Sequence, residues 1–172
     1  NAVSNTMGLR IAASEGYEIV NLDFRPPRDS SQTAYWREVD VRNTEAVSAA
    51  IAAVAPTCMM HLASDIDVNL RAMSEYRTTV DGTRNVISAA EALPGLERFV
   101  HVSTQYVVRP GVIPKSETEY VPYTVYGEAK AKTEKLIRAS RLGSWVIARP
   151  TIIWGPGHPS FADQIWRRMA EG

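Results

Sequence analysis

The sequence predicts an α/β protein with a doubly wound parallel sheet, and three observations lead to this prediction. Short apolar runs that read as strands alternate with longer segments of helical periodicity. The runs are apolar at most positions, which is typical of strands covered by helices on both faces. Several end in a polar residue or a proline, at the sheet edge where ligands bind in such folds. The expected strands are residues 18–23, 36–41, 58–62, 98–103 and 144–149.

The segments between these strands predict helices and loops. Pro56 and the pair Pro94-Gly95 each follow a helical pattern and act as its stop signal. The expected helices are residues 4–15, 44–55, 67–93, 125–141 and 160–171. The expected loops and turns are residues 25–33, 109–122 and 154–157, which carry prolines or glycines.

Size and composition narrow the class of protein. The chain has 172 residues, and we expect residues 1–172 to form a single domain. Its formal net charge of +0 argues against a surface for nucleic acid or an anionic membrane, and no apolar stretch is long enough to span a bilayer. The single cysteine, Cys58, fits a reducing compartment, so we expect a cytoplasmic protein. With three histidines and no clustered Cys/His spacing, we expect no metal site.

The pair Tyr126 and Lys130 is the first candidate for chemistry. Residues four apart lie on one face of a helix, so the hydroxyl and the ammonium can converge. A free tyrosine titrates near pH 10, and a nearby lysine charge lowers that value. The pair can therefore serve as a proton-transfer unit. The alternative is a tyrosine anchor beside a solvated lysine.

Seven short motifs, taken together and in order, resemble the extended short-chain dehydrogenase/reductase superfamily, in its NAD-dependent epimerase/dehydratase branch. Each motif is loose by itself, but their order and spacing are specific. The resemblance implies a Rossmann fold. The motifs are the segment from Gly16 to Asp23, Val39-Asp40-Val41, His61-Leu62-Ala63, Asp81-Gly82-Thr83, Val102-Ser103-Thr104, Tyr126-Gly-Glu-Ala-Lys130 and the segment from Arg149 to Gly157.

The resemblance implies three catalytic residues. Tyr126 would be the acid/base that exchanges a proton with the substrate hydroxyl while a hydride moves to the nicotinamide. Lys130 would lower the pKa of the tyrosine and hydrogen-bond the nicotinamide ribose. Thr104 would hydrogen-bond the reacting oxygen.

The resemblance also implies cofactor contacts at the strand ends. Asp23 would accept hydrogen bonds from the adenosine ribose, which suits NAD and disfavours the 2′-phosphate of NADP. Arg25 and Arg28 could offset that repulsion, so NADP stays open. The further expected contacts are Asp40 and Val41 at the adenine, Leu62 and Ala63 through their backbone, and Tyr126, Lys130 and Pro150. The alternatives are a turn residue for Asp23, a helix cap for Asp40 and a packed strand residue for His61.

The chain departs from the family pattern at its front and its back. The family opens with a strand and a glycine-rich turn that binds the pyrophosphate, and neither stands before residue 4. That strand lies in the middle of the order 3-2-1-4-5-6, so its neighbours would face a gap of roughly 10 Å. We therefore expect a domain that is incomplete at its front, or a slot filled by another segment. We also expect most of the substrate lobe to lie beyond residue 172.

Smaller departures bear on the substrate. Ile152 stands where many sugar-nucleotide members have asparagine, Gln105-Tyr106 stands where dehydratases have Asp-Glu, and Thr79 replaces a usual asparagine. The Gln105-Tyr106 pair disfavours a dehydratase, and Ile152 weakens the nucleotide-sugar interpretation. We expect an NAD-dependent epimerase or dehydrogenase that acts on a secondary alcohol of a sugar or sugar nucleotide. The alternative is a non-catalytic member that binds a dinucleotide or a protein partner as a regulator.

Two expectations concern the helices 67–93 and 125–141. The resemblance implies a homodimer in which these helices form a four-helix bundle. Their candidate apolar surface is Met73, Tyr76, Val80, Ile87, Leu136 and Ile137. The spacing of Glu134 and Arg138 predicts an ion pair on the exposed helix face.

Overall fold

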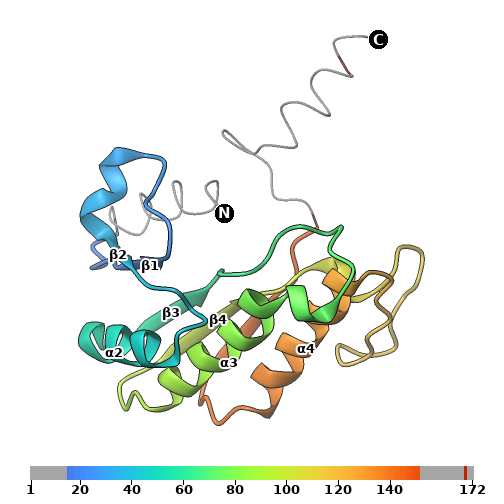
Figure 1. The fold of residues 1–172 in the computed structure, drawn as a ribbon. Coiled ribbons are helices and arrows are strands. Elements are labelled where there is room, and N and C mark those ends of the chain that lie inside the picture. Colours follow the sequence, from blue (N-terminus) through green and yellow to red (C-terminus); the bar gives the residue numbers. More distant parts are fainter. Residues whose placement is uncertain (1–14, 152–168, 170–172) are drawn as a thin grey trace. The chain divides into compact units, whose positions relative to one another are not determined.

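The structure, a computed structural model, describes residues 15–151 and Met169 (Figure 1). The chain divides into two compact units, residues 1–38 with 152–172 and residues 39–151, and each is described by itself. The helices expected at 4–15 and 160–171 and the turn at 154–157 lie outside the described residues, as does Ile152.

The first unit contains a pair of short parallel strands. Strand β1 (Asn21–Asp23) and strand β2 (Trp36–Glu38) pair with Asn21 opposite Trp36 and Asp23 opposite Glu38. The indole Nε1 of Trp36 donates to the carbonyl of Asp23 at 2.9 Å, which ties the two strand ends together. Residues 25–29 form the expected loop, but the end of the predicted loop belongs to a 3-10 helix, η1 (Ser30–Tyr35), because the carboxylate of Asp29 caps its first turn.

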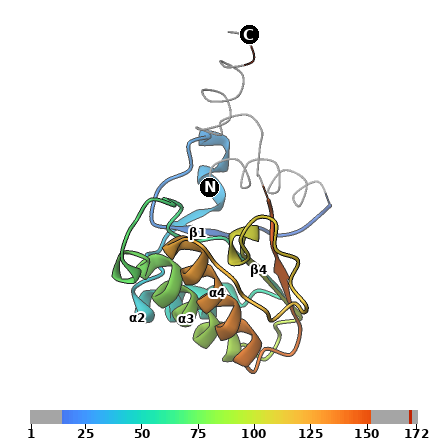
Figure 2. The ribbon, with the colours of Figure 1, turned by 90° about the vertical axis from the view of Figure 1, so that its right-hand side faces the viewer.

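The second unit is a three-stranded parallel sheet with helices on one face. Strands β3 (Cys58–His61), β4 (Arg98–Val102) and β5 (Trp145–Ala148) lie in that order, with His61 opposite His101 and Phe99 opposite Trp145. Helices α2 (Thr44–Val54), α3 (Arg77–Glu91) and α4 (Val125–Ala139) lie side by side along this face (Figures 1 and 2). The two connections that cross through α3 and α4 move in the same direction, so both helices pack on one face.

The strand orders reproduce the two halves of the predicted arrangement. The orders are β1-β2 and β3-β4-β5, as in the two halves of a doubly wound sheet. The parallel sheets and the alternating helices confirm the Rossmann-type α/β fold. Among the described residues no strand pairs with both β1 and β3.

The helix expected at 67–93 begins ten residues later, so that part of the prediction is wrong. Helix α3 starts at Arg77, and only one 3-10 turn, η2 (Met73–Glu75), precedes it. Acidic side chains bind the backbone here: Asp67 accepts from the amide of Asn69 at 2.9 Å and Glu75 from the amide of Ala72 at 2.8 Å. Such local bonds offer the backbone an alternative to the helix.

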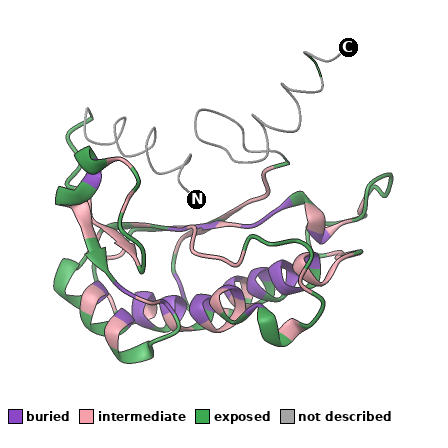
Figure 3. Cartoon of the chain, turned by 45° about the horizontal axis from the view of Figure 1, so that its top comes forward, coloured by how far each residue is buried: buried purple, intermediate pink, exposed green. Residues whose placement is uncertain are grey.

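Two buried histidines form the polar part of the core beneath the sheet. His61 and His101 are 5% and 1% exposed, and their ring centroids are 5.5 Å apart. In Figure 3 the buried residues of the core lie along the helices and the strands next to them. The Nε2 of His61 lies 3.0 Å from Oγ1 of Thr83, and the Nε2 of His101 lies 2.8 Å from Oγ1 of Thr133. His61 is thus a packed strand residue, which confirms that interpretation.

The threonines fix the protonation of both rings. The Thr83 hydroxyl donates to the carbonyl of Thr79 at 2.6 Å, and the Thr133 hydroxyl donates to the carbonyl of Lys130 at 2.7 Å. Because each hydroxyl has only one proton to donate, each must accept a hydrogen bond from the histidine Nε2–H. Burial, with the positive charge of Lys130, lowers the pKa of His61 to about 3 and that of His101 to about 2. Both rings are therefore neutral in the folded protein.

This core predicts a pH-dependent stability. As pH falls below the ordinary value of 6.5, the unfolded chain binds protons that the folded histidines exclude, so the free energy of unfolding decreases. In the whole protein, His101→Gln should reduce the slope of that decrease by about 1.4 kcal/mol per pH unit between about pH 5.5 and pH 4. Urea titrations across this range measure the slope, and equal slopes for both proteins would contradict the account.

Candidate active site

Thr104 and Tyr126 are brought together at the carboxyl end of β4. Thr104 follows the strand and is 6% exposed, and its hydroxyl lies near enough to Tyr126 to lower the pKa of that tyrosine. Helix α4 begins just before Tyr126 because the Thr124 hydroxyl accepts from the amide of Gly127 at 3.0 Å. The Tyr126 ring lies between the rings of Tyr76 and Tyr106, with centroids 6.1 and 5.9 Å away. The predicted pair of Thr104 and Tyr126 therefore shares one partly enclosed site.

Gly127 explains why a glycine follows the tyrosine. A Cβ at this position would overlap the backbone carbonyl of Tyr106 and lie 3.2 Å from the Cβ of Pro122. The short 3-10 helix η3 (Gln105–Val107) can approach the start of α4 because residue 127 has no side chain. The close approach holds Tyr106 against Tyr126.

The pKa of Tyr126 lies above its ordinary value. Burial is the main cause, since it disfavours the charged phenolate, and the nearby Tyr76 and Tyr106 raise the pKa further. The nearby Thr104 hydroxyl acts in the opposite direction and lowers this pKa. In this arrangement Tyr126 is a protonated hydroxyl at neutral pH and thus a proton donor.

Lys130 lies on the same helix face and is only 3% exposed. Its Nζ donates to the carbonyl of Val102 at 2.7 Å, and burial lowers its pKa to about 8, although Glu134 raises it. The expected lowering of the Tyr126 pKa by Lys130 is not found, because in this arrangement burial of the tyrosine raises that pKa. The alternative of a solvated lysine is wrong.

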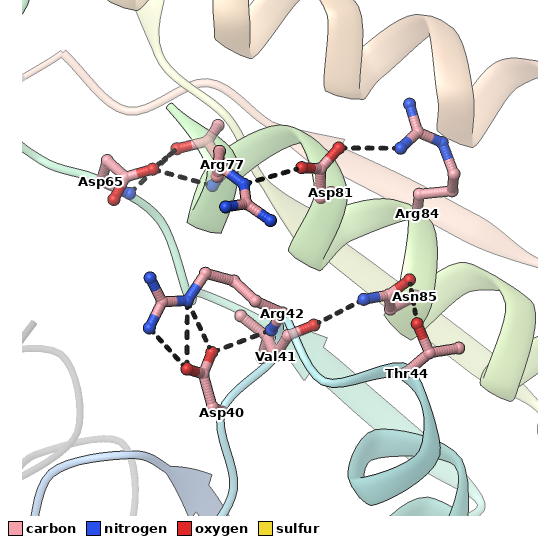
Figure 4. Close-up of polar contacts among 10 residues, drawn as sticks. Asp40, Val41, Arg42, Thr44, Asp65, Arg77, Asp81, Arg84 and Asn85 are labelled. Carbon is pink, nitrogen blue, oxygen red and sulfur yellow. Dashed lines mark hydrogen bonds and ion pairs between the residues drawn. The ribbon is translucent and has the colours of Figure 1, made fainter. Parts of the chain in front are cut away.

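Asp40 and Val41 are held in place by local bonds and by α3 (Figure 4). The carboxylate of Asp40 pairs with the Arg42 guanidinium at 2.6 Å, which holds the pKa of Asp40 below its ordinary value. The carbonyl of Val41 accepts from the Asn85 amide at 3.0 Å. A Cβ on Gly82 would lie 2.6 Å from Cγ2 of Val41, so the glycine lets α3 approach this segment.

The loop after β3 carries Leu62 and Ala63, which are half-buried. Thr79 holds the next part of this loop: it is fully buried, and its hydroxyl accepts from the amide of Asp65 at 2.9 Å and lies 3.0 Å from that of Ser64. The residue that departs from the family pattern therefore fixes the loop that follows the expected cofactor contacts.

Two further expected cofactor residues stand after strands. Pro150 follows β5, and its carbonyl accepts from the amide of Gln105 at 3.1 Å. Asp23 belongs to the first unit, where its carboxylate accepts from the amide of Arg25 at 2.9 Å, as a turn residue does. That bond uses the Oδ1 atom of the carboxylate.

A pocket of about 360 Å³ adjoins the site within the second unit. The rings of Tyr106 and Tyr123 stack in its wall, with centroids 5.5 Å apart and an interplanar angle of 19°. Val108 and Val112 add aliphatic lining, and Arg109 adds a guanidinium. This combination suits an apolar ring or chain with polar substituents.

From the sequence, Glu134 was not predicted to be buried, and this residue was assigned the wrong partner. Glu134 is 0% exposed and pairs with Arg149 at 2.6 Å, so the predicted exposed pair with Arg138 is wrong. Arg138 instead lies 3.7 Å from Glu117. The i,i+4 spacing along α4 could not indicate the pair of Glu134 and Arg149, because Arg149 follows β5 and lies outside the helix. The burial pattern of α4 was the signal that could have indicated it.

A sequence profile of the NAD dependent epimerase/dehydratase family matches residues 9–172. The chain belongs to this family. Family membership agrees with the strand orders and the parallel pairing of the fold.

Individual relatives are similar to the chain over part of their length. A 3-beta-hydroxysteroid dehydrogenase from Mycolicibacterium neoaurum is 28% identical over 77% of this chain and 40% of its own. An N-acetyl-alpha-D-glucosaminyl-diphospho-ditrans,octacis-undecaprenol 4-epimerase from Escherichia coli O157:H7 is 26% identical over 98% of this chain and 52% of its own. The chain spans about half the length of such relatives.

The fold is also found in a solved structure. A protein from Burkholderia cenocepacia J2315, classed provisionally as an epimerase, superposes with a TM-score of 0.80 at 25% identity. The match covers 99% of this chain and 57% of that protein. In the part of the chain that the structure describes, no helix has both the length and the apolar character for crossing a membrane.

The contact at Gly127 predicts a selective loss of stability. Gly127→Ala should destabilise the whole protein by about 1–3 kcal/mol, because the added methyl group meets the backbone of Tyr106. Gly143→Ala is the control, since nothing lies within 4 Å of a Cβ there. Denaturant midpoints measure both, and equal losses would contradict the proposed contact.

Proposed function

We propose that this chain carries the cofactor-binding region and the catalytic residues of an NAD-dependent oxidoreductase that acts on a secondary alcohol or its ketone. The observation that carries the proposal is that Tyr126 lies near the buried Thr104 at the end of β4, with Lys130 buried on the same helix face. Membership of the NAD dependent epimerase/dehydratase family supports it.

In this proposal each side chain has a defined part. NAD, when bound, accepts or supplies the hydride. Tyr126 gives its hydroxyl proton to the carbonyl oxygen during reduction and takes it back during oxidation. Thr104 holds the same oxygen by a hydrogen bond. Lys130 has a pKa of about 8, so it is mostly an ammonium at neutral pH, and it hydrogen-bonds the nicotinamide ribose.

The cofactor contacts follow the strand ends. Asp23 accepts from the adenosine ribose, and its negative charge selects NAD over NADP. Asp40 and Val41 line the adenine, the backbone of Leu62 and Ala63 approaches the cofactor, and Pro150 lies near the nicotinamide side. The segment of Asp40 and Val41 is suited to this because Arg42 and Asn85 fix its conformation.

For the substrate, the first candidate is a sugar or sugar nucleotide, in an epimerase or a dehydrogenase. The similarity to a polyprenyl-diphosphate sugar 4-epimerase supports it. A second candidate is an alcohol on an apolar skeleton. The tyrosine-lined and valine-lined pocket and the similarity to a hydroxysteroid dehydrogenase favour this candidate. Assays with NAD, a UDP-sugar and a 3β-hydroxysteroid separate the two by kcat/KM.

The central test is Tyr126→Phe in the whole protein. Removing the hydroxyl should lower kcat by about 10²–10⁴-fold, because the proton has no donor or acceptor, and leave the Kd for NADH within about twofold. Tyr17→Phe is the control, since that ring is exposed and does not line the pocket. Steady-state kinetics and NADH fluorescence titration give both quantities.

Two results of this test would change the reading. Full turnover by Tyr126→Phe would exclude its acid/base role. The other result is a protein that binds NADH but turns over no alcohol or ketone, with the same Kd for NADH in the Tyr126→Phe variant. This result would favour the non-catalytic regulatory alternative.

We also propose a cytoplasmic homodimer that uses exposed parts of the segments 67–93 and 125–141. Tyr76, Ile87 and Ile137 are buried within the chain and cannot contribute, whereas Leu136 is half-exposed on α4. Leu136→Glu should convert the dimer to a monomer in light scattering. Val54→Glu, on the exposed face of α2, is the control that should leave the mass unchanged.

A further inference from the structure

Glu134 is a buried carboxylate one helical turn after Lys130. Its Oε1 accepts from the Ser103 hydroxyl at 2.5 Å and from Nε of Arg149 at 2.8 Å, and its Oε2 accepts from Nη2 of Arg149 at 2.6 Å. Ser103 is the neighbour of Thr104 at the end of β4, and Arg149 follows β5. One carboxylate therefore joins α4 to the ends of two strands beside the candidate catalytic residues.

Stability alone is a weak reason for this arrangement. A buried ion pair loses most of its Coulomb attraction to the cost of removing two charges from water, and an apolar pair of similar size often serves as well. The position of the pair suggests another use. Residues four apart face the same side of a helix, so Glu134 and the Lys130 ammonium share one side of α4.

We propose that Glu134 is a positioning residue for the proposed site, where its carboxylate keeps Lys130 charged and ties Thr104 to α4 through Ser103. The inference rests on the proposed function for its catalytic meaning. The geometry and the charge relation of Glu134 and Lys130 can be tested without turnover.

Among the groups near Lys130, Glu134 is the one whose negative charge favours the ammonium form of the lysine. His61 on β3 and His101 on β4 are neutral, and both feel the lysine as a repulsive charge. Tyr126 on the same helix is protonated, and burial also raises the pKa of Tyr120, whose hydroxyl accepts from Nε of Arg138 at 3.3 Å. Arg149 repels a second cation but is itself paired with Glu134. Burial pulls the pKa of Lys130 down to about 8, and Glu134 opposes that shift.

The test is the pKa of Lys130 in the whole protein, measured from the Cε chemical shift of ¹³C-labelled lysine with Lys130→Arg to assign the signal. Glu134→Gln should lower this pKa by about one pH unit, because burial then acts unopposed. Glu128→Gln is the matched control: it removes an exposed carboxylate from the same helix and should leave the pKa unchanged.

A second variant covers the case in which Glu134→Gln leaves Arg149 unpaired and does not fold. The double variant Glu134→Gln/Arg149→Gln removes both buried charges and should also lower the pKa of Lys130. An unchanged pKa in the variants that fold would overturn the inference.

A kinetic readout separates this inference from the proposed function. In an active enzyme the alkaline limb of kcat/KM for alcohol oxidation should move to lower pH with Glu134→Gln and stay in place with Glu128→Gln. An unmoved limb would overturn the catalytic part of the inference. A lowered pKa in a protein without turnover would support the charge relation and count against the proposed function instead.

Discussion

Helix α4 is fixed to strand β4 by three buried polar contacts, and the candidate site depends on them. Successive residues of the strand end each meet one side chain of the helix: His101 bonds Thr133, the Val102 carbonyl bonds Lys130, and Ser103 bonds Glu134. The contacts fix both the register and the rotation of the helix. Tyr126 is carried by the same helix, so its hydroxyl is aligned with Thr104 as a consequence.

Burial gives these contacts their precision and also determines the charges. A site shielded from water strengthens hydrogen bonds but disfavours ionised groups. The two histidines respond by staying neutral, which needs only a threonine acceptor for each. The charged form of Lys130 is harder to accommodate, because its ammonium has three hydrogen bonds to donate. One of them goes to the carbonyl of Val102. A carboxylate on the next turn is the simplest means of keeping that ammonium charged.

The sequence allowed much of the fold to be predicted, because the relevant signals are local. The apolar runs located all five strands, and the Tyr126–Lys130 spacing placed both residues on one face of α4. The prediction of a helix at the front of the 67–93 segment was wrong, because the carboxylates of Asp67 and Glu75 accept from backbone amides before the start of α3. The partner of Glu134 could not be predicted either. Spacing along a helix favours Arg138, whereas Arg149 is brought close only by the packing of β5 beside β4.

The raised pKa of Tyr126 and the lowered pKa of Lys130 act on opposite directions of the proposed reaction. Reduction of a ketone needs the tyrosine proton, which burial retains. Oxidation of an alcohol needs the phenolate, and in the proposed reaction the nicotinamide ribose is held by a lysine with a pKa of about 8. Raising the pH to deprotonate the tyrosine therefore also removes the lysine charge. In the proposed reaction, oxidation would therefore be favoured only where the ammonium persists, so the groups that hold the proton on Lys130 would influence the direction of catalysis together with the tyrosine.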